Sequence, residues 1–406
     1  MITSKAFVWI WLPQCAAPVV AGQISLIEGK YHFVYGRTYL ERQHSISLSP
    51  IELPLQRGTF EPEGLNEIHS CLRDAAPDAW GRRLLDYKYP NLSELDYMLL
   101  SSSNRIGALD FQQSGTHYKA RESTPPQLQD LLQAAQLIEA RKPLPPELDH
   151  ALLHGTSVGG ARPKALMTDN RKQYLAKFSS STDHYDVVKA EYVAMKLAKL
   201  AGINVAPVRL EHALGKDVLL VERFDRIAHD DFFERRLMLS GLSLLKLNEM
   251  EARYASYRQL AELIRHQFKN PINSLHEIYK RIVFNILIGN TDDHARNHAA
   301  FWDGTALSLT PAYDICPQNR TGREATQAMN LEGKQGNHST LANALSVCHI
   351  YRLEEWQAKE IINTIVSVVN DHWLTVCHEA NLSQIERDRL WKNAVLNPYC
   401  FEGYPQ

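Results

Sequence analysis

The stretch from Asn290 to Pro317 constrains this chain more than any other part of it. Asp292 is followed five residues later by Asn297, and Asp314 comes near the end of the stretch. Between them lie two short strand-like runs on either side of an Asp-Gly pair at 303–304, which is a two-residue signal for a β-hairpin. The order is therefore a carboxylate, an amide, a hairpin and a second carboxylate, all within one small region.

This order of groups is the one that protein kinases use. In kinases the first Asp accepts the proton of the substrate hydroxyl, while the Asn and the later Asp hold magnesium under the phosphates. The Asp-x4-Asn spacing alone can occur by chance, but the whole arrangement is much less common. Asp293 is an alternative base, although only Asp292 has an Asn at the fifth following position. His294 and His298 leave a metal-hydrolase site as a second alternative, weakened because the segment reads as loop and strand rather than helix.

Composition indicates an ordinary globular protein. The 406 residues are long enough for two or three domains, with 44% apolar and 22% charged residues. A net charge of -2 gives no sign of a nucleic-acid tail or a membrane-surface patch. Six cysteines without a Cys-x-x-Cys pair are typical of reduced cytoplasmic thiols. The apolar run at 6–12 is too short for a secretory signal and no run is long enough to span a bilayer, so a cytoplasmic location without membrane contact is expected.

The chain reads as β-rich at its start, mixed in its middle and helical from about residue 237. We predict a front subdomain at 1–125, a middle lobe at 126–230 and a helical lobe at 231–406. Strands are predicted at 7–12, 19–27, 31–35, 165–167, 173–178, 218–221, 299–302 and 306–309, with an extended edge at 45–55. Helices are predicted at 64–87, 92–100, 128–140, 187–201, 237–247, 257–268, 275–288, 353–379 and 382–394.

A glycine-bearing stretch, G-T-S-V-G-G-A-R-P-K, occupies Gly155–Lys164. It is not a Walker A loop, because alanine rather than lysine follows Gly160. It is either an ordinary tight turn or a turn whose backbone N–H groups approach phosphates. Lys177, at the end of a predicted strand, and Glu191, on the next predicted helix, could form the ion pair that kinases use. An exposed strand lysine is the alternative interpretation of Lys177.

Several stretches together resemble one known family, the HipA-like serine/threonine kinases of bacterial toxin–antitoxin modules. The resemblance covers nearly the whole chain. The matching stretches are 45–55, 76–85, 104–111, S-V-G-G-A-R-P-K at 157–164, V-E-R-F-D-R at 221–226, N-T-D-D-H-A-R-N at 290–297 and L-T-P-A-Y-D-I at 309–315.

The resemblance implies a fold and a set of roles. The implied fold is α+β, a two-lobed protein-kinase-like structure with a small β-rich N-terminal subdomain and a mostly helical C-terminal lobe. Asp292 would be the catalytic base, and Asn297 and Asp314 would ligate Mg²⁺. Ser157 would be the loop serine whose autophosphorylation ejects the loop and silences the enzyme. The residues implied to hold ATP are Ser157, Val158, Gly159, Gly160, Lys177, Glu191, Glu222, Phe224 and His294.

The implied function is that of an ATP- and magnesium-dependent serine/threonine protein kinase of toxin type. Its substrate would be a translation component such as an aminoacyl-tRNA synthetase. A small DNA-binding antitoxin is an implied partner, whereas the chain alone has no helix-turn-helix or basic arm and is expected not to bind DNA specifically. Two alternatives are a small-molecule kinase and a catalytically silent, nucleotide-binding repressor partner. Intact Lys177, Asp292, Asn297 and Asp314 argue against the silent partner.

Overall fold

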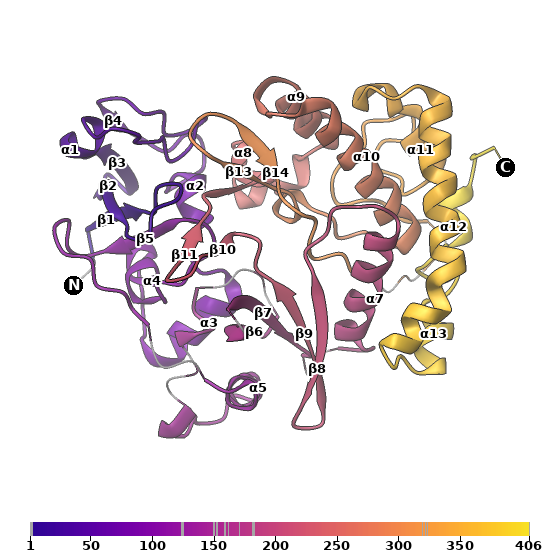
Figure 1. Cartoon of the computed structure of the whole chain (residues 1–406), viewed down its shortest axis with the longest axis horizontal. Helices are drawn as coiled ribbons and strands as arrows, with labels where there is room; N and C mark the ends of the chain where they lie inside the picture. Colours follow the sequence, from indigo (N-terminus) through magenta and orange to yellow (C-terminus); the bar gives the residue numbers. More distant parts are fainter. Residues whose placement is uncertain are drawn as a thin grey trace. The chain divides into compact units, whose positions relative to one another are not determined.

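The computed structural model shows a mixed α+β chain (Figure 1). The chain divides into two compact units. The first unit comprises Met1–Thr182, Glu211–Leu239 and Phe301–Thr305, and the second comprises Asp183–Leu210, Ser240–Ala300 and Ala306–Gln406. The division into domains at 1–125, 126–230 and 231–406 stays a prediction. The structure describes residues 3–122, 126–148, 151, 153–157, 160, 162–169, 171–180, 183–318, 320, 322 and 324–405.

The first unit begins with a five-stranded sheet in the order β4-β3-β2-β1-β5. Strand β2 matches its predicted bounds, and β1 and β3 lie within two residues of theirs. Glu28 and Gly29 join β2 to β3 with positive φ angles of 49° and 84°, which suits a tight hairpin whose twist matches the strands. The strands are β1 (Lys5–Ile10), β2 (Val19–Ile27), β3 (Lys30–Tyr35), β4 (Thr59–Phe60) and β5 (Leu109–Gln112).

The helix predicted at 64–87 is wrong in its length. The structure has two helices there, and Pro77 and Asp78 lie between them. Proline lacks a backbone N–H and disfavours a helical residue before it, so the chain breaks at this point and restarts after Asp78. The helices of this region are α1 (Arg37–Leu40), α2 (Ser70–Arg73), α3 (Ala79–Lys88) and α4 (Glu94–Leu100).

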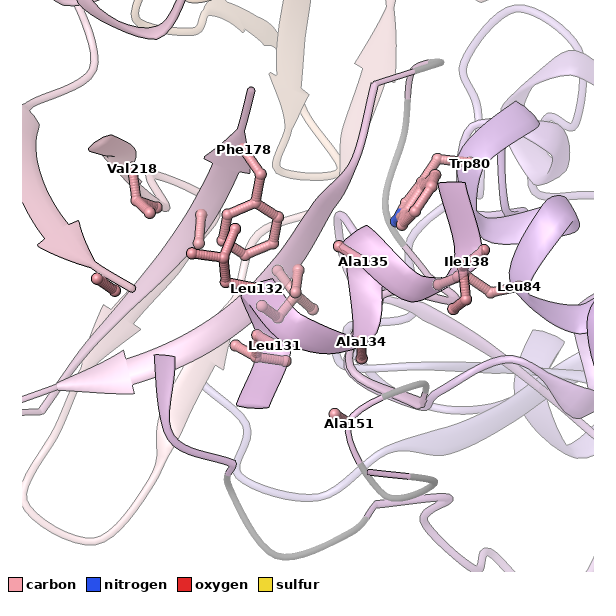
Figure 2. Packing of buried hydrophobic residues seen from close by; sticks show 14 of the residues in the cluster. Trp80, Leu84, Leu131, Leu132, Ala134, Ala135, Ile138, Ala151, Phe178 and Val218 are labelled. Carbon is pink, nitrogen blue, oxygen red and sulfur yellow. The ribbon is translucent and has the colours of Figure 1, made fainter. Parts of the chain in front are cut away.

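The second sheet of this unit has the order β6-β7-β9-β8 and carries an apolar core on its helical side. Figure 2 shows Leu131, Leu132 and Ile138 of α5 beside Phe178 of β7 and Trp80 of α3. This core gives the strands that follow the glycine stretch a rigid support. The elements are α5 (Leu128–Glu139), η1 (Pro146–Leu148), β6 (Lys164–Asp169), β7 (Lys172–Phe178), β8 (Val208–Ala213) and β9 (Lys216–Glu222), followed by β10 (Arg226–Ala228) and β11 (Phe233–Arg235).

The second unit is mostly helical, as the sequence predicts. The helix predicted at 237–247 is wrong: the chain forms β12 (Met238–Ser240) and then one short helix, because Ser240 caps a new helix through its side chain. Four residues, rather than two, separate β13 from β14 at the predicted hairpin. The helices are α7 (Val187–Leu200), α8 (Gly241–Leu244), η2 (Glu249–Tyr254), α9 (Tyr257–Gln267), α10 (Pro271–Ile288), η3 (Ala295–Asn297), α11 (Leu341–Ser346), η4 (Cys348–Tyr351), α12 (Glu355–Glu379), α13 (Gln384–Leu390) and η5 (Pro398–Phe401).

The remaining strands, β13 (Ala299–Trp302) and β14 (Leu307–Leu309), belong to a sheet of order β12-β13-β14. They bring the chain from Asn297 to Asp314. Within the described part of the chain, no helix is both long and apolar enough to cross a membrane.

Candidate active site

Helix α10 delivers the loop that contains Asp292. Its last two turns are buried, and it ends at Gly289, whose φ of 75° lies in the left-handed region that favours glycine. A Cβ at this position would lie 2.5 Å from the carbonyl oxygen of Ala394. The side chain of Asn290 then donates to Oδ1 of Asn285 at 3.0 Å. The loop therefore leaves the helix in one fixed direction.

A buried carboxylate, Asp293, holds this loop from inside. It is 3% exposed and accepts hydrogen bonds from the Tyr257 hydroxyl and from Nε2 of His298, the latter at 2.9 Å. Burial would raise the pKa of Asp293, but His298 and the two hydrogen bonds outweigh it and lower the pKa. The carboxylate of Asp293 is thus engaged with the protein interior, whereas its neighbour Asp292 is exposed.

Asp292 shares a small cluster with His294 and Asp314. Partial desolvation raises the pKa of Asp292, and the carboxylates of Asp314 and Asp293 raise it further, while His294 opposes them. All three residues belong to the second unit. Nδ1 of His294 is buried and has no hydrogen-bond partner among the described residues.

Asn297 and Asp314 supply oxygen donors beside Asp292. Asn297 is buried, and its Nδ2 donates to the backbone carbonyl of Asp292 at 3.3 Å. Asp314 has a φ of 60°, a conformation uncommon for a residue other than glycine and frequent at functional sites. The preceding Tyr313 is fixed by a 2.7 Å bond from its hydroxyl to the carbonyl of Arg296.

These donors fit Mg²⁺, which prefers a few carboxylate and amide oxygens and keeps several water ligands. A cation would also relieve the repulsion between the carboxylates of Asp292 and Asp314. The alternative metal-hydrolase site finds no support, because Nε2 of His298 is bound to Asp293. Such a hydrolase site needs three or more converging His, Cys, Asp or Glu side chains, and the described part of the chain contains no such group.

The glycine stretch lies in the first unit. The hydroxyl of Ser157 donates to the carbonyl of Asn104 at 3.0 Å, and the residue is 2% exposed. Gly160 has a φ of 88°, and its N–H donates to Oδ2 of Asp78 at 2.8 Å. Val158 and Gly159, which the sequence also predicts to contact ATP, lie outside the described residues.

Two lysines follow this stretch on paired strands. Lys177 of β7 lies opposite Lys164 of β6 in the antiparallel register. Lys177 is 9% exposed, so the interpretation as an exposed strand lysine is wrong. Nζ of Lys164 would lie 2.3 Å from a Cβ on Gly160, so this ammonium sits directly against the glycine turn. The sequence analysis did not assign Lys164 a role, because only the pairing of the strands brings it beside Lys177.

The remaining predicted residues fall in different units. Glu191 is a 5% exposed residue of α7 in the second unit, whereas Lys177 belongs to the first, so their ion pair stays a prediction. Glu222 ends β9 in the first unit and pairs with Lys172 at 2.7 Å. Phe224 follows, with its ring 6.0 Å from that of Phe301.

The V-E-R-F-D-R stretch also has a structural role that the sequence analysis missed. Asp225 is buried and forms ion pairs with Arg223 at 2.7 Å and with Arg226 at 2.8 Å. Its Oδ2 also accepts the N–H of Gly107 at 2.7 Å, and Arg223 donates to the carbonyl of Arg105. This network ties the segment after β9 to the N-R-I-G stretch, two segments that are far apart in the sequence. The signal in the sequence was the R-F-D-R pattern at 223–226, in which two arginines flank one Asp.

Two protein-family models match this chain. The model for the HipA-like C-terminal domain matches residues 156–373, more than half of the chain, and the model for the HipA N-terminal domain matches residues 15–112. The chain therefore belongs to the HipA family. The serine/threonine-protein kinase toxin HipA of Shewanella oneidensis is 27% identical over 183 residues, which cover 39% of this chain and 42% of that protein. Y4mE of Sinorhizobium fredii is 28% identical over 149 residues, 36% of this chain and 34% of that one. The chain thus matches less than half of the length of these relatives.

A solved structure agrees with this assignment at the level of the fold. A chain in the complex of HipA, HipB and operator DNA from Shewanella oneidensis matches 98% of this chain and is itself matched over 97%, with a TM-score of 0.71 and 18% identity. The predicted α+β, protein-kinase-like fold is confirmed.

Proposed function

We propose that this chain is an ATP- and magnesium-dependent serine/threonine protein kinase of toxin type. The observation that carries the proposal is the grouping of Asp292, His294, Asn297 and Asp314 on one loop system of a HipA-family fold. The resemblance to a named kinase toxin supports the same activity.

In this proposal each residue of the cluster has one task. Asp292 is exposed, and its raised pKa suits a carboxylate that accepts the proton of a serine or threonine hydroxyl. Asn297 and Asp314 would hold Mg²⁺, which neutralises phosphate charge when it is bound. The buried Asp293, through Tyr257 and His298, keeps the loop in position.

The proposed nucleotide ligands are the residues that the family resemblance implies. Ser157, Val158, Gly159 and Gly160 would contact the phosphates, and Lys177 would supply positive charge for them. Glu191 keeps the role that the family resemblance implies for it. The backbone from Glu222 to Phe224 would bind adenine, and the buried Nδ1 of His294 would meet a phosphate oxygen.

Autophosphorylation at Ser157 would silence the kinase. The Ser157 hydroxyl is buried against the carbonyl of Asn104, so a phosphate on it has no room and brings nearly two negative charges into that place. Phosphorylation therefore requires the stretch to leave its position, and return is blocked. Mass spectrometry after incubation with ATP should find phosphate on Ser157 as activity falls. Loss of activity with Ser157 unmodified would contradict this mechanism.

The proposed substrate is a translation component such as an aminoacyl-tRNA synthetase, which would make growth arrest the outcome in the cytoplasm. The proposed partner is a small DNA-binding antitoxin, since the related HipA structure contains HipB and operator DNA. Purified chain, magnesium and γ-labelled ATP are added to a cell lysate, and labelled proteins are identified. We expect label on a translation protein. Label confined to small molecules would instead favour a small-molecule kinase.

A further inference from the structure

The first unit contains a cavity of about 500 Å³ that the proposed nucleotide site does not use. Its wall combines Trp11, which follows β1, with Leu166 and Gln173 of β6 and β7, and with Phe233 and Arg235 of β11. This volume is in the range of pockets that enclose small organic molecules. Among the described residues on its wall, none is one of those assigned above to ATP or Mg²⁺.

Arg235 is the unusual group of this wall. Its guanidinium carbon lies 3.5 Å from the ring centroid of Trp11, and Nη1 donates to the carbonyl of Ser103 at 2.7 Å. No carboxylate among the described residues lies within ion-pair distance of it. A partly buried guanidinium that has an aromatic ring on one face and a single backbone acceptor retains several donors for a ligand.

The buried carboxylates of this region already form ion pairs with other arginines. Arg223 and Arg226 both bind Asp225. Asp110 is likewise shared, between two further arginines, Arg105 at 2.7 Å and Arg121 at 2.6 Å. Two buried carboxylates are thus shared by four guanidinium groups, and neither forms an ion pair with Arg235. Among the described residues of the wall, Glu122 is the only acidic side chain, and it is exposed. The cavity is therefore electropositive.

Aromatic rings form much of the remaining wall. Trp11 and Tyr118 meet edge to face with centroids 5.4 Å apart, and Phe232 and Phe233 add two further rings. Flat aromatic walls favour a planar ligand, and a guanidinium on an aromatic face favours a bidentate anion. Asn104 and Gln173, which bond to each other at 3.3 Å, complete the polar part of the wall.

We propose that this cavity binds a small organic anion, a planar aromatic group bearing a carboxylate or phosphate that pairs with Arg235. The ligand would contact β6 and β7, the strands that follow the glycine stretch and carry Lys164 and Lys177. This site is independent of the proposed kinase activity and stands even if that activity fails.

The full-length protein can be titrated with naphthalene-2-carboxylate and with the uncharged naphthalene-2-carboxamide, using calorimetry. The carboxylate should bind at least about tenfold more tightly than the amide, because only the carboxylate pairs with the guanidinium. Arg235→Gln should lose at least about tenfold in carboxylate affinity. The matched control is Arg37→Gln, an exposed arginine of the same unit whose side chain is 83% exposed, and it should bind within about twofold of wild type. Saturating magnesium and a non-hydrolysable ATP analogue should leave the affinity unchanged.

Equal binding of the carboxylate and the amide, wild-type affinity in Arg235→Gln, or no binding up to about 2 mM would overturn the proposal. Displacement of the carboxylate by the ATP analogue would also overturn it, since the probe would then occupy the nucleotide site. If Arg235→Gln does not fold, the comparison of carboxylate with amide on wild-type protein still decides.

Discussion

At the scale of single residues, two adjacent carboxylates have opposite environments. Asp292 is exposed and Asp293 is buried against Tyr257 and His298. In the sequence, the spacing to Asn297 favours Asp292 as the base. The structure adds a physical reason, because the buried carboxylate of Asp293 is not accessible to a substrate. The partners of Asp293 could not be predicted, because Tyr257 lies on α9 and reaches the loop only through the packing of the second unit.

Two substitutions of Asp314 separate the effect of its carboxylate on nucleotide binding from the effect of its left-handed backbone on stability. Asp314→Ala and Asp314→Gly both remove the carboxylate, so both should weaken binding of the magnesium–nucleotide complex. Only glycine relaxes the left-handed backbone, so the glycine variant should be about 1 kcal/mol more stable than the alanine variant. Calorimetry and denaturant unfolding measure the two effects. Unchanged nucleotide affinity in both variants would remove Asp314 from the site.

At the scale of elements, local signals predicted most helices and central strands, and they failed where distant contacts decide. The helices predicted at 257–268 and 275–288 end within one residue of α9 and α10, although α10 begins four residues earlier than predicted. Strands β4, β5, β8, β10, β11 and β12 were missed. All of them except β8 have four residues or fewer, and their pairing depends on partners elsewhere in the chain. Residues 237–247 are apolar enough for a helix, yet three of them join a sheet.

The end of α10 should be sensitive to a single methyl group. Gly289→Ala should destabilise the protein by more than about 1 kcal/mol, because it adds both left-handed strain and a clash with the carbonyl oxygen of Ala394. Gly202→Ala is the matched control, because Gly202 follows α7 with a φ of 73° and open space around it. The difference between the two, measured by denaturant unfolding, isolates the clash. Equal losses of stability in the two variants would show that the backbone at Ala394 moves away without cost.

Strand β5 should make the first unit sensitive to acid. Burial would raise the pKa of Asp110, but Arg105 and Arg121 outweigh it and lower that pKa to about 2. A lowered pKa stabilises the fold above the unfolded value of about 3.9, and this stability is lost as pH falls toward about 2. Asp110→Asn mimics the protonated form and leaves buried Arg105 unpaired, so it should be less stable at pH 7. Its deficit relative to wild type should shrink by about 1 kcal/mol by pH 3 in urea titrations. A constant deficit would contradict this account.

At the scale of the whole molecule, the family and the net charge favour a separate partner protein as the one that binds DNA. The related structure holds HipA together with HipB and operator DNA, whereas this chain has a net charge of -2. A net charge close to zero gives little of the electrostatic attraction that drives DNA binding, so we expect the chain alone not to bind DNA specifically. Titration of the purified chain onto its own upstream DNA at several salt concentrations should show no tight, sequence-dependent binding. Such binding without an added protein would defeat the proposal of a separate DNA-binding partner.

Phosphoryl transfer by Asp292→Asn tests the central claim most directly. The substitution keeps the size of the side chain and removes the proton acceptor, so transfer from γ-labelled ATP to protein should fall by at least about 10². Magnesium–nucleotide binding and the unfolding midpoint should stay near wild type, because Asp292 is exposed. Asp388→Asn, the same change at an exposed position on α13, should retain full activity. Full transfer by Asp292→Asn would contradict the assignment of this loop as the catalytic centre.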